Sequence, residues 1–448
     1  MGFTKSLNIT PKALFRLTSL TIAIVVGGMS GYGQSSPYTL GTLGLLQSEG
    51  FTQHQLMGGL SSSLADEGDF TLVNPASLAS LKYTSLQTGS YFNFIEQESA
   101  TKRRTDRDGD FGGLALAFPI SLKHNLGFGA GLTRYTDLNY LIINETEEHG
   151  NDVRNVFAGN GGINQFSFGL GYQPIKGLSI GLRAGFLSGS IETSEDKQFP
   201  DNKNLFSVRK IYTDYFSGVK YTVGVQYGRQ DSTGRFFRIG VNGSPLTNAN
   251  VGRDEIVTTY NAAGNYFIDT LSRREDGGYE QSLPMEYRAS LSVGKKDIWL
   301  IGIEYNHQAW SEVSRESSAN FFDAQSFTIG GYWQLKSERK TQMTSFSERA
   351  KDYLARTRIY YGVQQRNLYT GVVNQKVMET KLSLGLGLPL TRFYRTEGVK
   401  KSFVSRINVG AEYTMRGSTD PGMIQENILG IKLGLTFNDK WFNKRKYR

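Results

Sequence analysis

The segment 427–437 alternates between two kinds of side chain, and this feature constrains the fold more than any other. One parity holds Leu429, Ile431, Leu433, Leu435 and Phe437, whereas the other holds Ile428, Gly430, Lys432, Gly434 and Thr436. Successive side chains of a β-strand point to opposite faces, so one face here is continuously apolar and the other is mostly small or polar. The same pattern recurs at 382–390 and 178–186. Many such strands without a helical middle are typical of a transmembrane β-barrel, whose outward face meets lipid.

An apolar stretch near the N-terminus indicates export. Three basic residues precede Leu17–Gly28, and small residues follow it up to Gly33. We therefore predict that residues 1–33 form a cleaved signal peptide and that the mature chain begins at Gln34. The alternative is a retained membrane anchor, but an anchor needs about 20 consecutive apolar residues, more than this stretch offers. The sequence contains no cysteine, so the exported chain would use no disulfide.

Fourteen segments alternate like strands, and the connections between them sort by length. The segments lie near 83–97, 111–118, 125–138, 163–173, 178–190, 214–228, 235–243, 285–294, 298–307, 322–335, 356–363, 379–390, 401–416 and 427–437. Connections after even-numbered strands are mostly short, whereas those after odd-numbered strands are long and polar, as at 139–162, 191–213 and 244–283. Outer-membrane barrels have short periplasmic turns and long outer loops. We therefore predict an all-β fold, a 14-stranded antiparallel transmembrane β-barrel over residues 83–437, with both termini in the periplasm. The alternative is a soluble protein of several sandwiches, but its strands would be about half as long.

Two features mark the predicted periplasmic side. The connection 336–355 is long for a turn, and Ser345 and Glu348 within it have capping-box spacing, which predicts a short helix. The tail 438–448 carries five basic residues and one acidic residue. The net charge of +9 comes mostly from this tail and from the predicted signal peptide, so the barrel itself is nearly neutral. The sequence also has no motif that would read a nucleic-acid groove. We therefore predict no nucleic-acid partner.

Residues 34–82 lack strand alternation and are predicted to form a hatch, or plug, inside the barrel. A 14-stranded barrel is wide enough to leave a lumen that its own side chains do not fill. Small inward residues such as Gly127, Gly181 and Gly385 leave room for another segment of chain. The motif Asn74-Pro75-Ala76-Ser77 favours a turn, so it is either the corner that leads into the first strand or a ligand contact.

The segment from Met57-Gly58-Gly59 to Asn74-Pro75-Ala76-Ser77 resembles the N-terminal hatch of the FadL family, outer-membrane transporters of long-chain fatty acids and hydrocarbons. The ending from Ile431 to Phe437, with the basic residues after it, is similar to a Bacteroidota branch of that superfamily, which includes PorV-like secretion-system barrels. The resemblance implies a hatched 14-stranded barrel and a hydrophobic ligand held by the hatch. The candidate hatch and ligand-binding residues are Leu56, Met57, Gly58, Gly59, Leu60, Phe70, Asn74, Pro75, Ala76 and Ser77.

Searches for catalytic and metal-binding patterns lead us to predict no enzyme, no metal and no cofactor. The four histidines lack metal-ligand spacing, and no serine of the predicted mature chain lies in a nucleophile-elbow pattern. The run Asp106–Asp110 has Ala117 where an EF-hand needs glutamate, so we predict a solvated loop tip. Seven aromatic residues near predicted strand ends are expected to form interfacial girdles: Trp299, Tyr305, Trp310, Trp333, Tyr360, Tyr361 and Tyr413.

Two functional hypotheses of different classes follow. The first is passive transport of a hydrophobic small molecule, a fatty acid or hydrocarbon, across the outer membrane, driven by burial of apolar ligand surface. The alternative is a non-transporting scaffold or accessory subunit of a secretion or outer-membrane protein assembly machinery, with periplasmic or assembly proteins as partners. A porin for polar solutes is a third hypothesis, which the predicted hatch disfavours. In each case the surrounding partner is the lipid bilayer of the outer membrane.

Overall fold

The computed structural model describes residues 36–99, 102–264, 266–313, 321–335, 346–372, 375–396 and 399–441. The predicted signal peptide and residues 442–448 of the predicted tail lie outside these ranges. Among the described residues, no helix combines the length and the apolar character of a membrane span.

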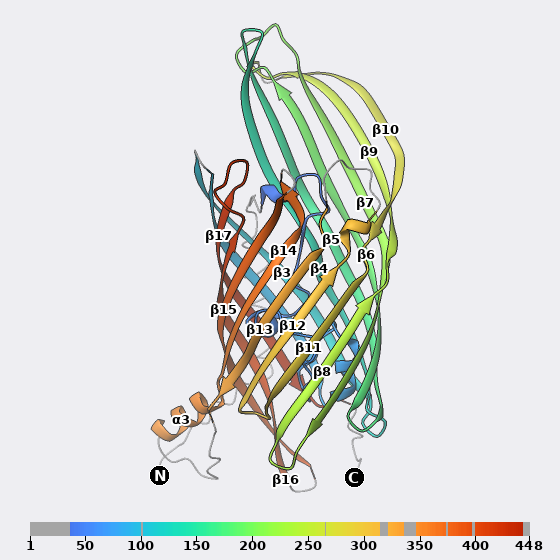
Figure 1. The fold of residues 1–448 in the computed structure, drawn as a ribbon, viewed down its shortest axis with the longest axis vertical. Helices are drawn as coiled ribbons and strands as arrows, with labels where there is room; N and C mark the ends of the chain where they lie inside the picture. The colour runs from blue at the N-terminus through green and yellow to red at the C-terminus, as the bar shows by residue number, and fades with distance from the viewer. Residues whose placement is uncertain are drawn as a thin grey trace, which may run out of the picture.

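A single antiparallel sheet closes on itself to form the wall of the molecule (Figure 1). Its segments are β2 (Thr84–Glu98), β3 (Arg103–Ser121), β4 (Leu126–Glu148), β5 (Asn151–Ile175), β6 (Leu178–Gln198), β7 (Ser207–Gln230), β8 (Arg235–Ser244), β9 (Thr247–Asn261), β10 (Tyr266–Leu283), β11 (Glu286–Lys295), β12 (Trp299–Gln308), β13 (Ala324–Gln334), β14 (Arg358–Val372), β15 (Gln375–Thr396), β16 (Val399–Arg416) and β17 (Gln425–Asp439). The last pairs with the first, from Gln425↔Glu98 to Asp439↔Thr84. Closure satisfies the backbone groups of the wall, as surrounding hydrocarbon requires.

Two strands of the wall are each broken once, at the same level. Pro245-Leu246 separates β8 from β9, and Pro284-Met285 separates β11 from β10. The pairing resumes across both breaks, because β8 pairs with β11 and β9 pairs with β10. Proline has no backbone N–H to donate to a ladder, which explains why both strands break there. The sixteen described segments therefore make the 14-stranded barrel that the sequence predicts.

The long connections predicted as loops are strands in the structure. Most of 139–162, 191–213 and 244–283 belongs to the hairpins β4–β5, β6–β7 and β9–β10, which rise well beyond the other strands in Figure 1. The run Asp106–Asp110 was also wrongly expected at a loop tip, since it pairs with β2 inside β3. These segments leave the apolar band, so their strands carry no continuous apolar face for sequence reasoning to detect.

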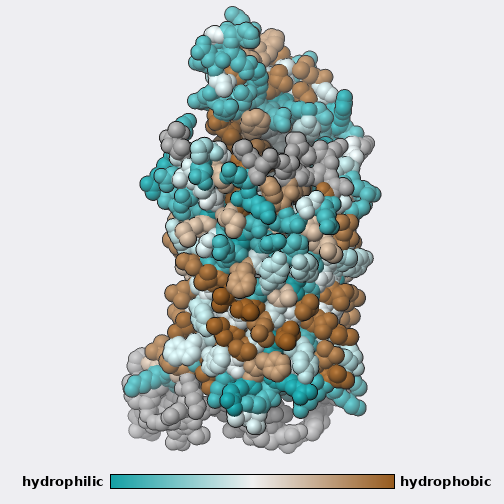
Figure 2. Space-filling view, in the orientation of Figure 1, coloured by the Kyte–Doolittle hydropathy of each residue, from teal (hydrophilic) through white to brown (hydrophobic). Residues whose placement is uncertain are grey.

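An apolar band surrounds the lower part of the wall. Leu384 is 62% exposed and Leu433 is 49% exposed, whereas Ser383 on the opposite face is buried at 7%. Figure 2 shows this band as brown side chains below a mostly hydrophilic upper region. The alternation predicted for these strands is confirmed, and the band is the lipid-facing surface of a transmembrane barrel.

Five of the seven aromatic residues predicted for an interfacial girdle are exposed, as that role requires. Trp299, Tyr305, Trp333, Tyr361 and Tyr413 are exposed on the wall. The two others were predicted wrongly, because Trp310 and Tyr360 are buried inside the barrel at 0% and 2% exposure. Trp310 lies in a short 3-10 helix, η3 (Trp310–Glu312), on a connection that folds inward. Its closeness to a strand end therefore did not show whether its side chain faces the lipid or the lumen.

The short helix predicted at the long turn is present as α3 (Phe346–Arg356). It precedes β14 at the end of the barrel that carries the short turns, and Figure 1 shows it beside the wall. At the same end, β17 includes Asn438 and Asp439, so the wall extends two residues into the predicted tail.

We predict that Leu384→Arg destabilises the barrel in lipid. A charged side chain on the lipid face costs about 2–4 kcal/mol near the bilayer midplane. Urea titration of folding into liposomes, followed by tryptophan fluorescence, measures this loss. The matched control is Thr270→Arg in β10, which is exposed on the upper extension. An equal effect of the two substitutions would contradict the assignment of the band.

Candidate functional site

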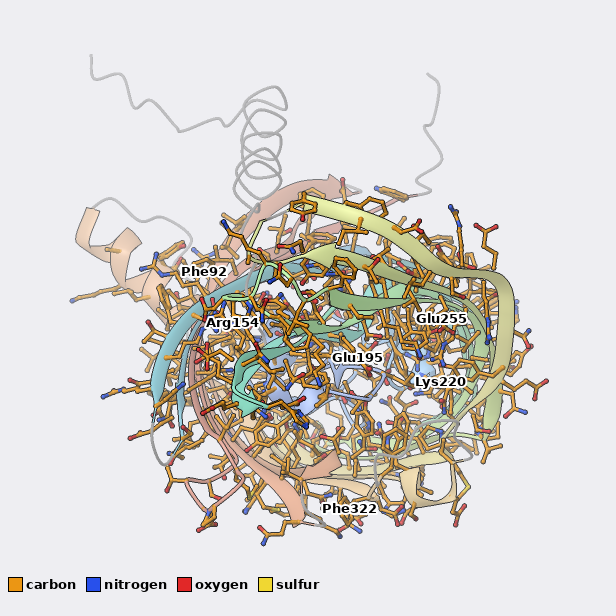
Figure 3. All side chains as sticks on the ribbon, turned by 90° about the horizontal axis from the view of Figure 1, so that it is seen from above. Phe92, Arg154, Glu195, Lys220, Glu255 and Phe322 are labelled. Carbon is orange, nitrogen blue, oxygen red and sulfur yellow. The ribbon has the colours of Figure 1, made fainter. Side chains whose placement is uncertain are left out.

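The N-terminal segment lies inside the barrel. It contains the 3-10 helix η1 (Pro37–Thr39), the short strand β1 (Leu45–Leu46), the helix α2 (Thr52–Gln55) and the 3-10 helix η2 (Pro75–Ser80). β1 pairs with β4 on the inner side of the wall, and η2 packs against β5, β6 and β7. Seen from above, side chains crowd the interior of the ring of strands (Figure 3). We call residues 36–83 the hatch.

Inward glycines of the wall make the room for the hatch. A Cβ atom added at Gly181 would lie 2.3 Å from the backbone nitrogen of Ala76, and one added at Gly127 would lie 2.1 Å from the carbonyl oxygen of Leu78. A Cβ atom added at Gly385 would lie 2.5 Å from the side chain of Leu56. Real Cβ contacts are not this short, so a larger residue at Gly181 or Gly127 would displace the hatch backbone, and one at Gly385 would displace the Leu56 side chain. The predicted role of these three glycines is confirmed.

The first group of predicted site residues follows α2. Leu56, Met57 and Leu60 pack in one buried cluster together with Leu64, Leu300, Tyr332 and Tyr360. Gly58 and Gly59 have φ angles of +72° and +93°, which an L side chain rarely adopts, so both are needed for the turn between these leucines. The Gly58 N–H also donates to Ser383 Oγ at 3.1 Å.

Phe70 belongs to a different cluster. It packs with Phe51, Leu72, Leu78, Leu81, Ala115 and Ala117. Of the four predicted apolar residues, Met57 and Phe70 line a common cavity, whereas Leu56 and Leu60 do not line it. They form two packed clusters that join the hatch to different parts of the wall.

The predicted motif at 74–77 forms the N-terminal turn of η2. The Asn74 side chain accepts a hydrogen bond from the Ala76 N–H at 3.1 Å and donates to the Ser62 carbonyl at 2.9 Å. Ser77 Oγ donates to the Thr71 carbonyl at 2.8 Å and accepts from the Thr71 N–H at 3.2 Å. All four residues of the motif are buried. These contacts are typical of a structural corner that holds the hatch. The side-chain polar atoms of Asn74 and Ser77 are hydrogen-bonded within the protein.

A buried layer of charges joins the hatch to the wall, and sequence reasoning did not find it. Arg183 Nη1 lies 2.9 Å from Glu49 Oε2, and Lys220 Nζ lies 2.7 Å from Glu286 Oε2. The Glu304 carboxylate accepts from the Ser61 and Ser62 backbone N–H groups at 2.9 and 2.7 Å. Figure 3 shows Lys220 within the ring of strands. The only signal in the sequence was charge at inward positions of strands.

A second buried network fastens the beginning of the hatch. Glu379 accepts from Arg366 at 2.6 Å and from Arg416 at 2.8 Å. Arg416 also reaches Glu426, which accepts a hydrogen bond from Ser36 Oγ at 2.9 Å. Because an unpaired buried charge is costly, moving the hatch away from the first network would be strongly unfavourable, since Arg183 would lose Glu49. The second network joins wall residues to one another, and the hatch adds the hydrogen bond from Ser36.

An apolar cluster closes the lumen toward the long hairpins. Trp310 stacks on Tyr369 with ring centroids 4.2 Å apart, and Phe321 packs edge-on against both rings. Tyr369 Oη donates to the Gly44 carbonyl of the hatch at 2.5 Å. The buried residues of this cluster are Leu43, Tyr135, Leu138, Tyr140, Ile163, Leu187, Ile191, Phe216, Ala249, Val251, Leu283, Trp310, Val313, Phe321 and Tyr369.

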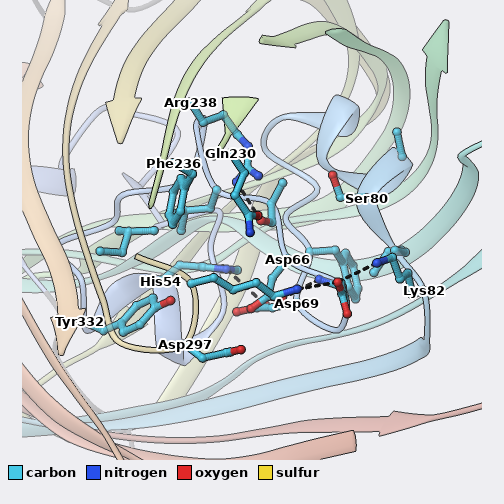
Figure 4. A pocket seen from close by; sticks show the side chains of 18 of the residues that line it. His54, Asp66, Asp69, Ser80, Lys82, Gln230, Phe236, Arg238, Asp297 and Tyr332 are labelled. Atoms are coloured by element: carbon cyan, nitrogen blue, oxygen red, sulfur yellow. Dashed lines mark hydrogen bonds and ion pairs between the residues drawn. The ribbon is translucent and has the colours of Figure 1, made fainter. Parts of the chain in front are cut away.

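A cavity of about 260 Å³, lined by both charged and apolar side chains, opens at the short-turn end (Figure 4). Glu67 lies at its edge, 2.7 Å from Lys82 Nζ and 2.6 Å from Lys296 Nζ. Burial raises the pKa of the Glu67 carboxyl, but the hydrogen bonds from Lys296 and Lys82 outweigh this effect and hold the pKa below its usual value of 4.5. The contact is therefore present above that pH and is lost only as the pH falls through the lowered pKa. Within the described residues, no group of three or more acidic or histidine side chains is arranged to hold a metal.

The closed wall, the lipid-facing band and the inserted N-terminal segment define a transmembrane β-barrel with an internal hatch. A family model described as BamG matches residues 12–448, so the chain belongs to the BamG family. No curated protein matches the sequence.

Three solved structures show the likeness of fold. The P. putida toluene transporter TodX is 12% identical, with 89% of this chain and 100% of TodX covered and a TM-score of 0.57. The CymD monoaromatic hydrocarbon channel is 12% identical, with coverages of 89% and 98% and a TM-score of 0.54. The Ralstonia pickettii toluene transporter TbuX is 12% identical, with coverages of 88% and 99% and a TM-score of 0.51. At these identities the likeness shows the fold alone.

We predict that Gly181→Val displaces η2 from the wall, because the added side chain would overlap the backbone of Pro75 and Ala76. Hydrogen exchange of the amides in 74–80, measured by mass spectrometry on the detergent-solubilised protein, should become faster. Gly252→Val in β9 is the matched control, since a Cβ atom there meets nothing within 4 Å. Unchanged hydrogen exchange in the Gly181 variant would contradict the close packing of η2 against the wall.

Proposed function

We propose that this chain is a non-transporting barrel subunit that acts as an accessory component of an outer-membrane protein assembly machinery. The observation that carries the proposal is the match of the BamG model over residues 12–448, since the Bam prefix denotes the β-barrel assembly machinery. In this proposal, the short-turn end faces the periplasm and the tall hairpins face the outside.

The packing of the lumen supports a scaffold. The hatch is held by the buried ion pair of Glu49 with Arg183 and by the hydrogen bond from Ser36 to Glu426, and Glu304 binds two successive backbone amides of the hatch. The apolar cluster around Trp310 fills the upper lumen. The cavity at the short-turn end combines apolar residues such as Phe70 with the charged residues Asp66, Asp69, Lys82 and Arg238, so an acyl chain or an aromatic hydrocarbon would meet buried charge there.

Passive transport of a hydrophobic small molecule is the second candidate. It is favoured by the likeness of fold to the monoaromatic hydrocarbon channels. The candidate residues Leu56, Met57, Leu60 and Phe70 would then have to separate from the wall to admit a ligand. Their burial in two clusters makes this the less favoured function.

Native purification in mild detergent followed by mass spectrometry tests the proposal. We expect the chain to be recovered in a stoichiometric complex with barrel-assembly proteins. We also expect liposomes that contain the purified chain to take up toluene no faster than protein-free liposomes. Recovery of the chain alone, together with toluene uptake that exceeds this background, would support transport and overturn the scaffold.

A further inference from the structure

The helix α3 turns a polar side toward the protein and an apolar side away from it. Asp352 and Arg356 form an ion pair at 2.7 Å, and their side chains are only 14% and 26% exposed. Arg356 also lines a cavity at the short-turn end of the barrel. Tyr353 and Leu354, by contrast, are 38% and 62% exposed. A surface helix of a soluble protein has the opposite arrangement, with its apolar face on the core.

The spacing of these residues explains the arrangement. Ala350, Tyr353 and Leu354 are spaced i, i+3 and i+4, so they share one face of the helix. Leu354 is two residues from both Asp352 and Arg356, which places it about 200° around the helix axis from each of them at 3.6 residues per turn. The apolar face therefore points away from the side of the helix that the protein covers.

The helix lies close to the level at which the lipid-facing band ends. Trp299 and Trp333 are paired across β12 and β13 near the short-turn end and are 37% and 46% exposed. Exposed tryptophans are typical of the boundary between hydrocarbon and headgroups. Trp333 also pairs with Ile359 of β14, which follows Arg356 by three residues. Three residues of chain span at most about 11 Å, so α3 ends near this boundary.

The helix also lies outside the wall. Figure 1 shows α3 beside the lower end of the barrel, and Figure 3 shows it from above as a pale orange helix outside the ring of strands. The space just outside the wall at this level is occupied by lipid headgroups, because the apolar band requires a surrounding bilayer. The apolar face of α3 is thus continuous with a surface that already contacts lipid.

The length of α3 indicates that it needs such a surface. The helix has 11 residues, and isolated helices shorter than about 12–15 residues are marginal in water. Amphipathic helices that lie in the plane of a membrane are stabilised by burying their apolar face at the boundary between headgroups and acyl chains. A bilayer beside the wall would stabilise α3 in this way.

We propose that α3 is an interfacial helix, which lies on the bilayer leaflet at the short-turn end and inserts Tyr353 and Leu354 among the phospholipid headgroups. The helix extends the lipid contact of the protein from the wall to a neighbouring segment. In the orientation given under the proposed function, the partner is the periplasmic leaflet of the outer membrane. The inference rests on the lipid-facing band and does not depend on the assembly role.

Fluorescence quenching by lipid tests this contact. The chain has no cysteine, so a Leu354→Cys variant of the full chain can be labelled specifically with the fluorophore NBD and reconstituted into phosphatidylcholine liposomes. We expect phosphatidylcholine with a nitroxide near the top of its acyl chain to remove most of the fluorescence, as it should for a label at Leu384→Cys in the band. Thr270→Cys on the upper extension is the matched control and should keep its fluorescence. Equally weak quenching at positions 354 and 270 would overturn the proposal.

Two other occupants of the apolar face give different outcomes. If a second copy of the chain covers the face, quenching by lipid stays weak and the emission of the label shifts to shorter wavelength as the protein-to-lipid ratio rises. If a partner protein covers it, the label stays in water in liposomes of the purified chain and is shielded only in native membranes. Either outcome would overturn the interfacial helix and leave the proposed assembly role standing.

Hydrogen exchange gives a second measurement that needs no label. Leu354→Ser should speed exchange of the amides in 350–356 when the full chain is in liposomes, because the helix loses part of its contact with lipid. Lys351→Ser is the matched control, since it changes the helix propensity by a similar amount at an exposed polar position. Equal acceleration by the two substitutions would contradict the lipid contact.

Discussion

A wall of fourteen strands encloses more space than its own inward side chains can fill, and the interior of the molecule is organised around that excess. The lipid outside requires the wall to close completely. The space inside is then occupied by a second layer of chain, the hatch, which needs glycines in the wall where the two backbones meet. Gly181 and Gly127 show this fit, since a Cβ atom at either would overlap the hatch backbone. Buried ion pairs such as Arg183 with Glu49 then fix the position of the hatch.

The sequence was sufficient to predict the wall where it meets lipid. Alternation such as that of Leu429, Ile431 and Leu433 is a local signal, and the lipid enforces it strand by strand. The tall hairpins were taken for loops because water on their outer faces enforces no alternation. The breaks at Pro245 and Pro284 also hid the fact that β9 and β10 continue wall strands.

The interior could be predicted only in outline. A hatch was expected from the wide lumen, and its leucines were expected to be buried. The partners of Glu49, Glu286 and Glu304 were not predictable, because which inward charges meet depends on the stagger of strands around the barrel and on the path of the hatch. Trp310 was misplaced for the same reason, since its connection turns inward.

We infer that the hatch stays seated while the protein works, and the hatch can be locked to test this. Ser63 of the hatch and Ser290 of β11 have their Oγ atoms 2.6 Å apart, and the chain has no cysteine of its own. The double variant Ser63→Cys/Ser290→Cys can therefore be joined by a disulfide on an otherwise cysteine-free background. We predict that cells carrying the oxidised variant assemble outer-membrane proteins at the same rate as cells carrying the unmodified chain. Loss of that assembly on oxidation, with recovery on reduction, would show that the hatch must move and would contradict the account.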